Sequence, residues 1–164
     1  MEKIRTFLDK TLEVLCSAVF VVMILTTLYQ IFMRTVMNNP NTVTEEFVRF
    51  SLVWLSMLAM AYVVGKRSHL AVTLLSDNLS GPNKRLLEIV IQALFLVFAA
   101  VIMVYGGWKA VSVTTGQISP SLSLSMGYVF LSVPVSGFIM FVYSLLNLMQ
   151  RKTEIENVEE SGEM

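Results

Sequence analysis

Four long stretches without a charged residue or a histidine are the feature that most constrains this chain. These stretches are residues 14–33, 50–65, 89–108 and 110–150. A membrane-spanning helix needs about 20 mostly apolar residues; the second stretch reaches that length only with Phe47 and Val48, and the fourth holds a loop and one span. Because 55% of the residues are hydrophobic and 15% are charged, the sequence predicts an all-α integral membrane protein with four transmembrane helices. The predicted spans are about 14–34, 46–65, 86–108 and 126–149.

The positive charges divide unequally between the two sides of such a membrane domain. One side carries Lys3, Arg5, Lys10, Lys66, Arg67, Lys84, Arg85, Arg151 and Lys152. The other side carries only Arg34, Arg49 and Lys109. By the positive-inside rule both termini are cytoplasmic, and residues 1–152 form a single membrane domain. The net charge of zero gives no indication of a nucleic-acid partner.

Two amphipathic segments outside the spans are predicted to form short interfacial helices on the cytoplasmic membrane surface. The first covers about residues 3–13, where polar and apolar side chains separate onto two stripes at helical spacing. An ordinary polar lead-in to the first span is the alternative. The second covers about residues 70–80. Residues 153–164 are rich in Glu and are predicted to be a disordered, solvated tail.

The second span begins with two acidic residues and an arginine. Thr42 followed by Glu45 fits a capping box, and Thr44 is a competing N-cap. Glu45 and Glu46 then fall in the first helical turn, where the helix dipole favours negative charge, and Arg49 shares their face. Two interpretations stay open: a water-exposed helix end with a snorkelling Arg49, or a contact buried against another subunit.

Prolines, glycines and asparagines mark the breaks between spans. Residues 38–41 read Asn-Asn-Pro-Asn and predict a short external turn, and the third span is predicted to end near residues 106–108. The uncharged segment that follows alternates serine with leucine around Pro120, which favours extended chain. In the fourth span, Pro134 and Gly137 permit a kink or close helix packing.

The sequence excludes several kinds of chemistry. His69 is the single histidine and Cys16 the single cysteine, which leaves no bis-histidine haem anchor, no His-based or Cys-based zinc site and no disulfide. No nucleotide-binding or nucleophile motif occurs, so we predict no enzyme. Charge is missing from the middles of all four spans, and this argues against transport by the chain alone.

Two blocks of residues resemble a known family. The first block comprises Arg34, Asn38, Glu45, Glu46, Arg49, Trp54, Lys66, Arg67 and His69. The second comprises Gln117, Ser119, Pro120, Met126, Tyr128, Pro134 and Gly137. Their order resembles the small membrane subunit, of the DctQ or SiaQ type, of tripartite ATP-independent periplasmic (TRAP) transporters. The chain departs from the family pattern at Val43 and Ser125, both near the predicted external face.

The resemblance implies a non-catalytic subunit of a bacterial inner-membrane transporter. Its partners would be a large multi-spanning transport subunit, a periplasmic substrate-binding protein and membrane lipids. Sodium coupling would reside in the large subunit, with no cofactor in this chain, and the substrate would be an organic acid, sialic acid first and C4-dicarboxylates next. The alternatives are a self-sufficient four-helix multidrug-type exporter and a membrane anchor of a respiratory enzyme.

Overall fold

The computed structural model describes residues 2–66 and 82–162. These residues contain seven helical segments: α1 (Glu2–Thr35), α2 (Thr42–Gly65), α4 (Pro82–Val97), η1 (Phe98–Gly106), α5 (Gly107–Thr114), α6 (Met126–Phe130) and α7 (Ser132–Gly162). They contain four helices long and apolar enough to cross a membrane, by length and composition. These candidate spans are Arg5–Thr35, Thr42–Gly65, Ile89–Thr114 and Met126–Asn147. The predicted all-α class with four spans is confirmed.

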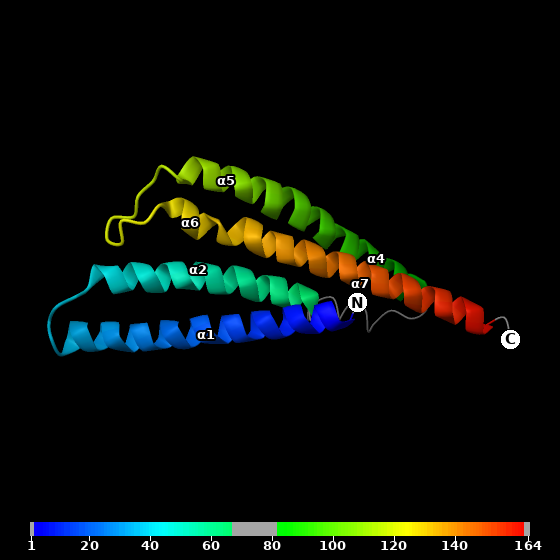
Figure 1. Ribbon diagram of the computed structural model, residues 1–164, viewed down its shortest axis with the longest axis horizontal. Helices are drawn as coiled ribbons and strands as arrows, with labels where there is room; N and C mark the ends of the chain where they lie inside the picture. Colours follow the sequence, from blue (N-terminus) through cyan, green and yellow to red (C-terminus); the bar gives the residue numbers. More distant parts are fainter. Residues whose placement is uncertain (1, 67–81, 163–164) are drawn as a thin grey trace.

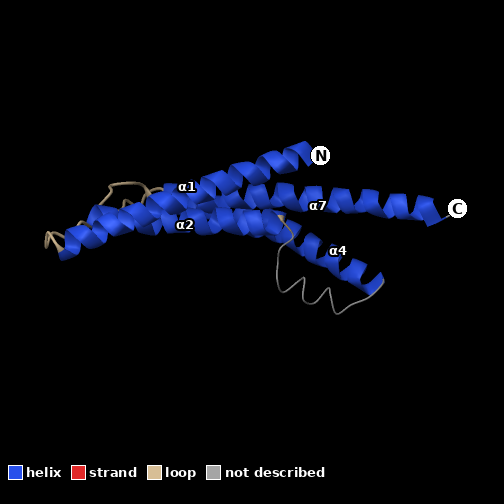
Figure 2. Cartoon of the chain, turned by 90° about the horizontal axis from the view of Figure 1, so that it is seen from below, coloured by secondary structure: helices blue, strands red, loops and turns tan. Residues whose placement is uncertain are grey.

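The helices run back and forth along one long axis. The loop between α1 and α2 and the loop between α5 and α6 lie at the same end, and the N-terminus lies toward the other end (Figures 1 and 2). We call the first of these ends the loop end, defined by residues 36–41 and 115–125. Both loops lie at the same end because each one connects two antiparallel spans and the first and third spans run in the same direction.

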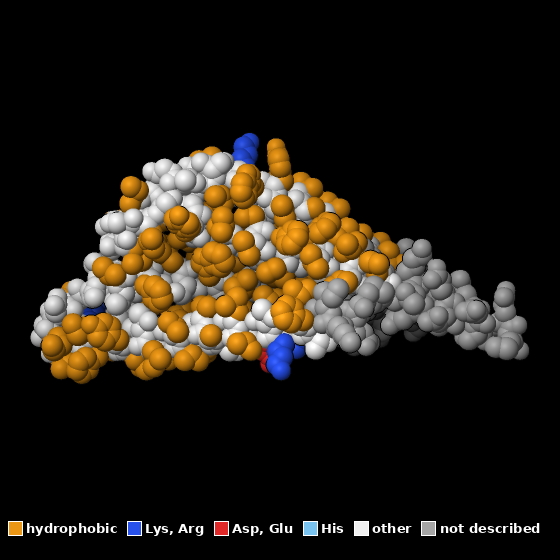
Figure 3. Space-filling view, in the orientation of Figure 1, with side chains coloured by type: hydrophobic (Ala, Val, Ile, Leu, Met, Phe, Trp, Pro, Cys, Tyr) orange, Lys and Arg blue, Asp and Glu red, His pale blue; other side chains and the backbone are white. Residues whose placement is uncertain are grey.

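The core lies between α7 and its neighbours. One buried cluster joins Ala61 of α2, Met103 of η1 and Met140 of α7, and a second joins Leu12 of α1 to Tyr143 of α7. Elsewhere the spans display large apolar side chains over the molecular surface (Figure 3). Such a surface suits lipid or a membrane partner rather than water.

The third span ends later in the sequence than predicted. Instead of stopping near residues 106–108, the helix continues to Thr114 and includes a π-helical stretch, η1. Glycine pairs commonly end helices, but here Gly107 has helical dihedral angles. A Cβ on Gly107 would lie 2.9 Å from Cδ of Pro134, so this glycine serves close packing against α7.

The fourth span is interrupted, and the interruption has an identifiable cause. Leu131 separates α6 from α7. Pro134 has no N–H to give to the carbonyl of Phe130, and its ring crowds that carbonyl. At Gly137 a Cβ would lie 2.5 Å from Cβ of Met103, so α7 and η1 approach closely there. The span therefore contains both a proline break and a close helix contact.

The first and last helices of the described residues extend beyond the predicted spans. The segment over residues 3–13 is continuous with the first span in α1, because no glycine or proline interrupts it. At the other end, α7 continues to Gly162, whereas a disordered tail was predicted. Residues 138–161 contain neither glycine nor proline, and Glu, Lys and Arg are good helix formers. The predicted helix at 70–80, together with Arg67 and His69, lies outside the described residues.

Candidate functional site at the loop end

The N-terminus of α2 is capped by Asn41, not by Thr42 or Thr44 as predicted. The Val43 N–H donates to Oδ1 of Asn41 at 3.0 Å, and the Thr44 hydroxyl donates to the Asn41 carbonyl at 2.8 Å. Asn41 has extended dihedral angles, as an N-cap residue should, and asparagine is a stronger cap than threonine. The helix therefore starts at Thr42, one residue before a Thr42 cap would allow and three before a Thr44 cap would allow, and Glu45 lies in its first turn.

Glu45 and Arg49 form an ion pair on the surface of this chain. Nη2 of Arg49 lies 3.2 Å from Oε1 of Glu45, and the two side chains are 65% and 57% exposed. Exposed pairs one helical turn apart contribute only about 0.3–0.5 kcal/mol. Within the chain itself, the pair matches the water-exposed interpretation.

Glu46 does not join that pair and instead binds the loop between α5 and α6. Oε2 of Glu46 accepts a hydrogen bond from the Ser119 hydroxyl. The same oxygen accepts the backbone N–H groups of Ser121, at 3.2 Å, and Leu122, at 3.0 Å. Hydrogen bonds to a carboxylate are stronger than neutral ones. We call this contact the Glu46 clamp; it joins segments 73 to 76 residues apart in the sequence.

The loop held by the Glu46 clamp is a compact turn with extended arms, as the serine-leucine alternation predicted. An isolated antiparallel bridge pairs Ile118 with Ser125. The Ser119 N–H donates to the Leu124 carbonyl at 2.8 Å, and Ser123 turns the chain with a φ of 53°. Ser119 is buried, whereas Ile118 is 71% exposed. The loop thus points its small polar side chain inward and an apolar side chain outward.

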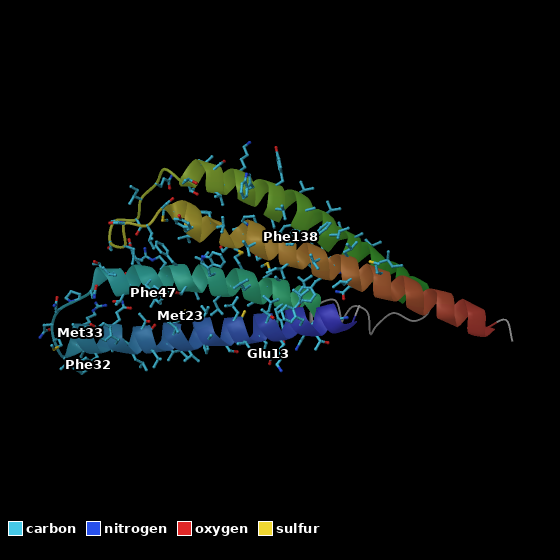
Figure 4. The ribbon with its side chains drawn as sticks, in the orientation of Figure 1. Glu13, Met23, Phe32, Met33, Phe47 and Phe138 are labelled. Atoms are coloured by element: carbon cyan, nitrogen blue, oxygen red, sulfur yellow. The ribbon has the colours of Figure 1, made fainter. Side chains whose placement is uncertain are left out.

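Three predicted site residues meet in a second feature at the loop end. Arg34, Asn38 and Glu45 line a pocket of about 440 Å³. The pocket lies between the end of α1, where Phe32 and Met33 are labelled, and the start of α2, just before Phe47 (Figure 4). Its other lining residues are Gln30, Pro40, Asn41 and Thr42. We call it the Arg34 pocket.

The remaining predicted residues take different positions. Trp54 is partly buried and packs against the Leu12–Leu58–Tyr143 cluster. It also lines an apolar groove of about 520 Å³ between α1, α2 and the α6–α7 span, to which Tyr128 contributes. Gln117 and Pro120 are exposed on the loop, and Met126 is the first residue of α6. The two sequence blocks therefore meet at the Glu46–Ser119 contact and in this groove, but their other residues do not form one site.

Sequence reasoning missed a polar junction away from the loop end. The Tyr143 hydroxyl donates to Oδ1 of Asp9 at 2.6 Å, and Nη2 of Arg5 donates to the Gly65 carbonyl at 3.0 Å. A Cβ on Gly65 would lie 2.7 Å from the Tyr143 ring. Arg5 and Asp9 were visible as part of a polar stripe, but Tyr143 lies in a charge-free stretch and gave no signal. This Asp9–Tyr143 junction ties α1, α2 and α7 together.

The chemistry of these features is structural. Within the described parts of the chain, no group of three His, Cys, Asp or Glu side chains is placed to hold a metal ion. The carboxylates of Glu46 and Asp9 accept hydrogen bonds in a helix-to-loop and a helix-to-helix contact instead. The geometry thus defines a helical membrane subunit whose polar contacts lie toward the ends of its spans.

Comparison with known families agrees with this class. The model of the DctQ component of tripartite ATP-independent periplasmic transporters matches residues 23–153, most of the chain. The chain belongs to the DctQ family of TRAP transporter small subunits. Members of this family are non-catalytic, multi-pass components of the bacterial inner membrane. Membership decides against both the multidrug-type exporter and the respiratory anchor.

Individual relatives give the same result. A TRAP transporter small permease protein of Haemophilus influenzae is 21% identical over 91% of this chain and 92% of its own length. The sialic acid TRAP transporter small permease protein SiaQ of Vibrio cholerae is 23% identical over 92% of this chain and 88% of its own length. The isethionate TRAP transporter permease protein DctMQ of Oleidesulfovibrio alaskensis is 31% identical over 64% of this chain.

The DctMQ relative also bears on the partner of this chain. Only 17% of the length of DctMQ corresponds to the chain, so the small subunit forms a minor part of a much longer permease there. Pairing of the small subunit with a large permease subunit is therefore a property of the family.

Proposed function

We propose that this chain is a static brace for the large transport subunit of a TRAP transporter. The Glu46 clamp is the observation that carries the proposal, because it fixes the α5–α6 loop to the start of α2. The Asp9–Tyr143 junction fixes three helices away from the loop end. A subunit tied in both places resists internal motion, which is what a support for a moving partner requires.

The loop end would help dock the periplasmic substrate-binding protein. This assignment follows from the positive-inside rule, which puts both termini in the cytoplasm and the loop end in the periplasm. Residues Ile118 and Leu124 are exposed on the loop, and exposed apolar side chains favour contact with a partner. The Glu46 clamp would hold them in one arrangement for that contact.

Transport chemistry would reside in the large subunit, which would bind sodium and an organic acid. The relatives' names support an acid substrate but differ in which acid: SiaQ is named for sialic acid and DctMQ for isethionate. Sialic acid stays the first candidate and a C4-dicarboxylate the second. The partner proteins would select between them, because the polar contacts of this chain lie toward the ends of its spans.

The brace is tested by sodium-driven uptake into vesicles. Vesicles holding the large subunit alone are compared with vesicles holding the large subunit and this chain, each with the binding protein added. We expect uptake only when this chain is present, and copurification of the chain with the large subunit. Full uptake without this chain would overturn the brace.

A further inference from the structure

The Arg34 pocket carries one positive charge that the chain itself does not neutralise. Glu45 is the only acidic residue among those lining it, and Glu45 is paired with Arg49 at 3.2 Å. Among the described residues, Glu45 pairs with Arg49, and no carboxylate lies within ion-pair distance of Arg34. The pocket therefore presents an unpaired guanidinium to whatever enters it.

The other lining groups suit an acidic ligand. Gln30, Asn38 and Asn41 bring side-chain amides and Thr42 a hydroxyl, all of which can donate hydrogen bonds to a carboxylate. A guanidinium presents a planar fork of N–H donors that matches the two oxygens of a carboxylate. We propose that the Arg34 pocket receives an acidic side chain of the periplasmic binding protein, an inference that rests on the proposed function.

Exposure favours a carboxylate carried by a protein over a free organic acid. Arg34, Asn38 and Glu45 are all exposed, so the pocket is open to solvent. A single exposed ion pair is too weak to capture a small molecule. A carboxylate on a folded partner gains from further contacts made in the same encounter, and the α5–α6 loop lies at the same end for such contacts (Figure 1).

Position favours a water-soluble partner over one within the membrane. The pocket lies where two candidate spans, Arg5–Thr35 and Thr42–Gly65, end and begin. Its turn residues Asn38 and Pro40 belong to neither span. A charge at this place steers the approach of a soluble partner and makes the encounter depend on salt.

The test uses the reconstituted complex of this chain with the large subunit. Uptake is measured as a function of binding-protein concentration for the unchanged chain, Arg34→Gln, Arg34→Lys and the control Lys109→Gln. Lys109 is an exposed cation on α5 that does not line the pocket. We expect Arg34→Gln to raise the half-saturating concentration about fivefold at an unchanged plateau and to weaken its salt dependence. Lys109→Gln should stay near the unchanged chain, and Arg34→Lys, which keeps the charge but loses the planar fork, should lie between the unchanged chain and Arg34→Gln.

Three results would overturn the inference. One is an Arg34→Gln curve that overlies that of the unchanged chain. Another is a lower plateau with loss of the copurified large subunit, which would assign the pocket to that subunit. The third is an effect that follows the anionic lipid content of the vesicles, which would assign it to a lipid phosphate. Failure of the proposed function would show differently, as uptake by the unchanged complex that does not respond to the binding protein.

Discussion

The hydroxyl of Tyr143 and the carboxylate of Asp9 form a hydrogen bond of 2.6 Å between residues 134 positions apart. Tyr143 itself is completely buried, and its ring packs on Gly65. One side chain thus contacts α1 through its oxygen and α2 through its ring. Because one side chain makes both contacts, substitution of Tyr143 should weaken the packing of α7 against α1 and α2 together.

Tyr143→Phe should destabilise the protein by about 1–2 kcal/mol, because the ring stays but Asp9 loses its donor. Thermal unfolding of the purified chain in detergent measures the change. Tyr105→Phe is the matched control, since Tyr105 is 72% exposed. Equal melting temperatures for the two variants would show that the hydrogen bond adds nothing to stability.

Gly137→Ala should destabilise the contact between α7 and η1 by about 1–3 kcal/mol, as overpacked cores do. The added methyl would lie 2.5 Å from Cβ of Met103 and 3.2 Å from its carbonyl carbon, so backbone would have to move. Gly116→Ala is the control, because nothing lies within 4 Å of a Cβ there. Denaturation of both variants in detergent compares them, and a Gly137→Ala variant as stable as Gly116→Ala would contradict the close contact.

Glu46→Ala should release the α5–α6 loop, because three hydrogen-bond donors would lose one acceptor oxygen. We expect proteolytic cleavage within residues 115–125 to become several-fold faster, and assembly with the large subunit to weaken. Glu45→Ala removes only an exposed ion pair and should change neither measurement. Cleavage that is equally slow in both variants would show that the clamp does not hold the loop.

Asn41→Ala should destabilise α2 by about 0.5–2 kcal/mol, the usual effect of removing an N-cap. Thr42→Ala should have a smaller effect, because Thr42 is the first residue of the helix and not its cap. Hydrogen exchange at the first turn of α2 distinguishes the two. A larger effect of Thr42→Ala than of Asn41→Ala would contradict the Asn41 cap and favour the capping box of Thr42 and Glu45.

The helical class and the number of spans could be predicted, because charge is excluded from the membrane interior and the sequence therefore contains long uncharged stretches. The end of the third span could not, since Gly107 looks the same whether it ends a helix or accommodates a neighbour. Only the position of Pro134 in space shows that it accommodates one.

The acidic pair shows the same limit on a smaller scale. Glu45 and Glu46 are adjacent and were both expected to share a face with Arg49. In the structure Arg49 pairs with Glu45, whereas Glu46 binds the α5–α6 loop. The two carboxylates have different partners because neighbouring residues on a helix point about 100° apart. The choice between them depends on a loop more than 70 residues away in the sequence, which local spacing does not encode.

The π-helical stretch η1 changes which residues of the third span lie on the same face of the helix. Ala99, Met103 and Gly107 follow one another every four residues, and all three are buried. In an α-helix such a spacing drifts around the axis, but the wider i→i+5 turn of a π-helix winds more slowly. A helical wheel drawn with 3.6 residues per turn will therefore misplace the lipid-facing and protein-facing sides beyond Phe98, and mutagenesis of this span should follow the three-dimensional structure.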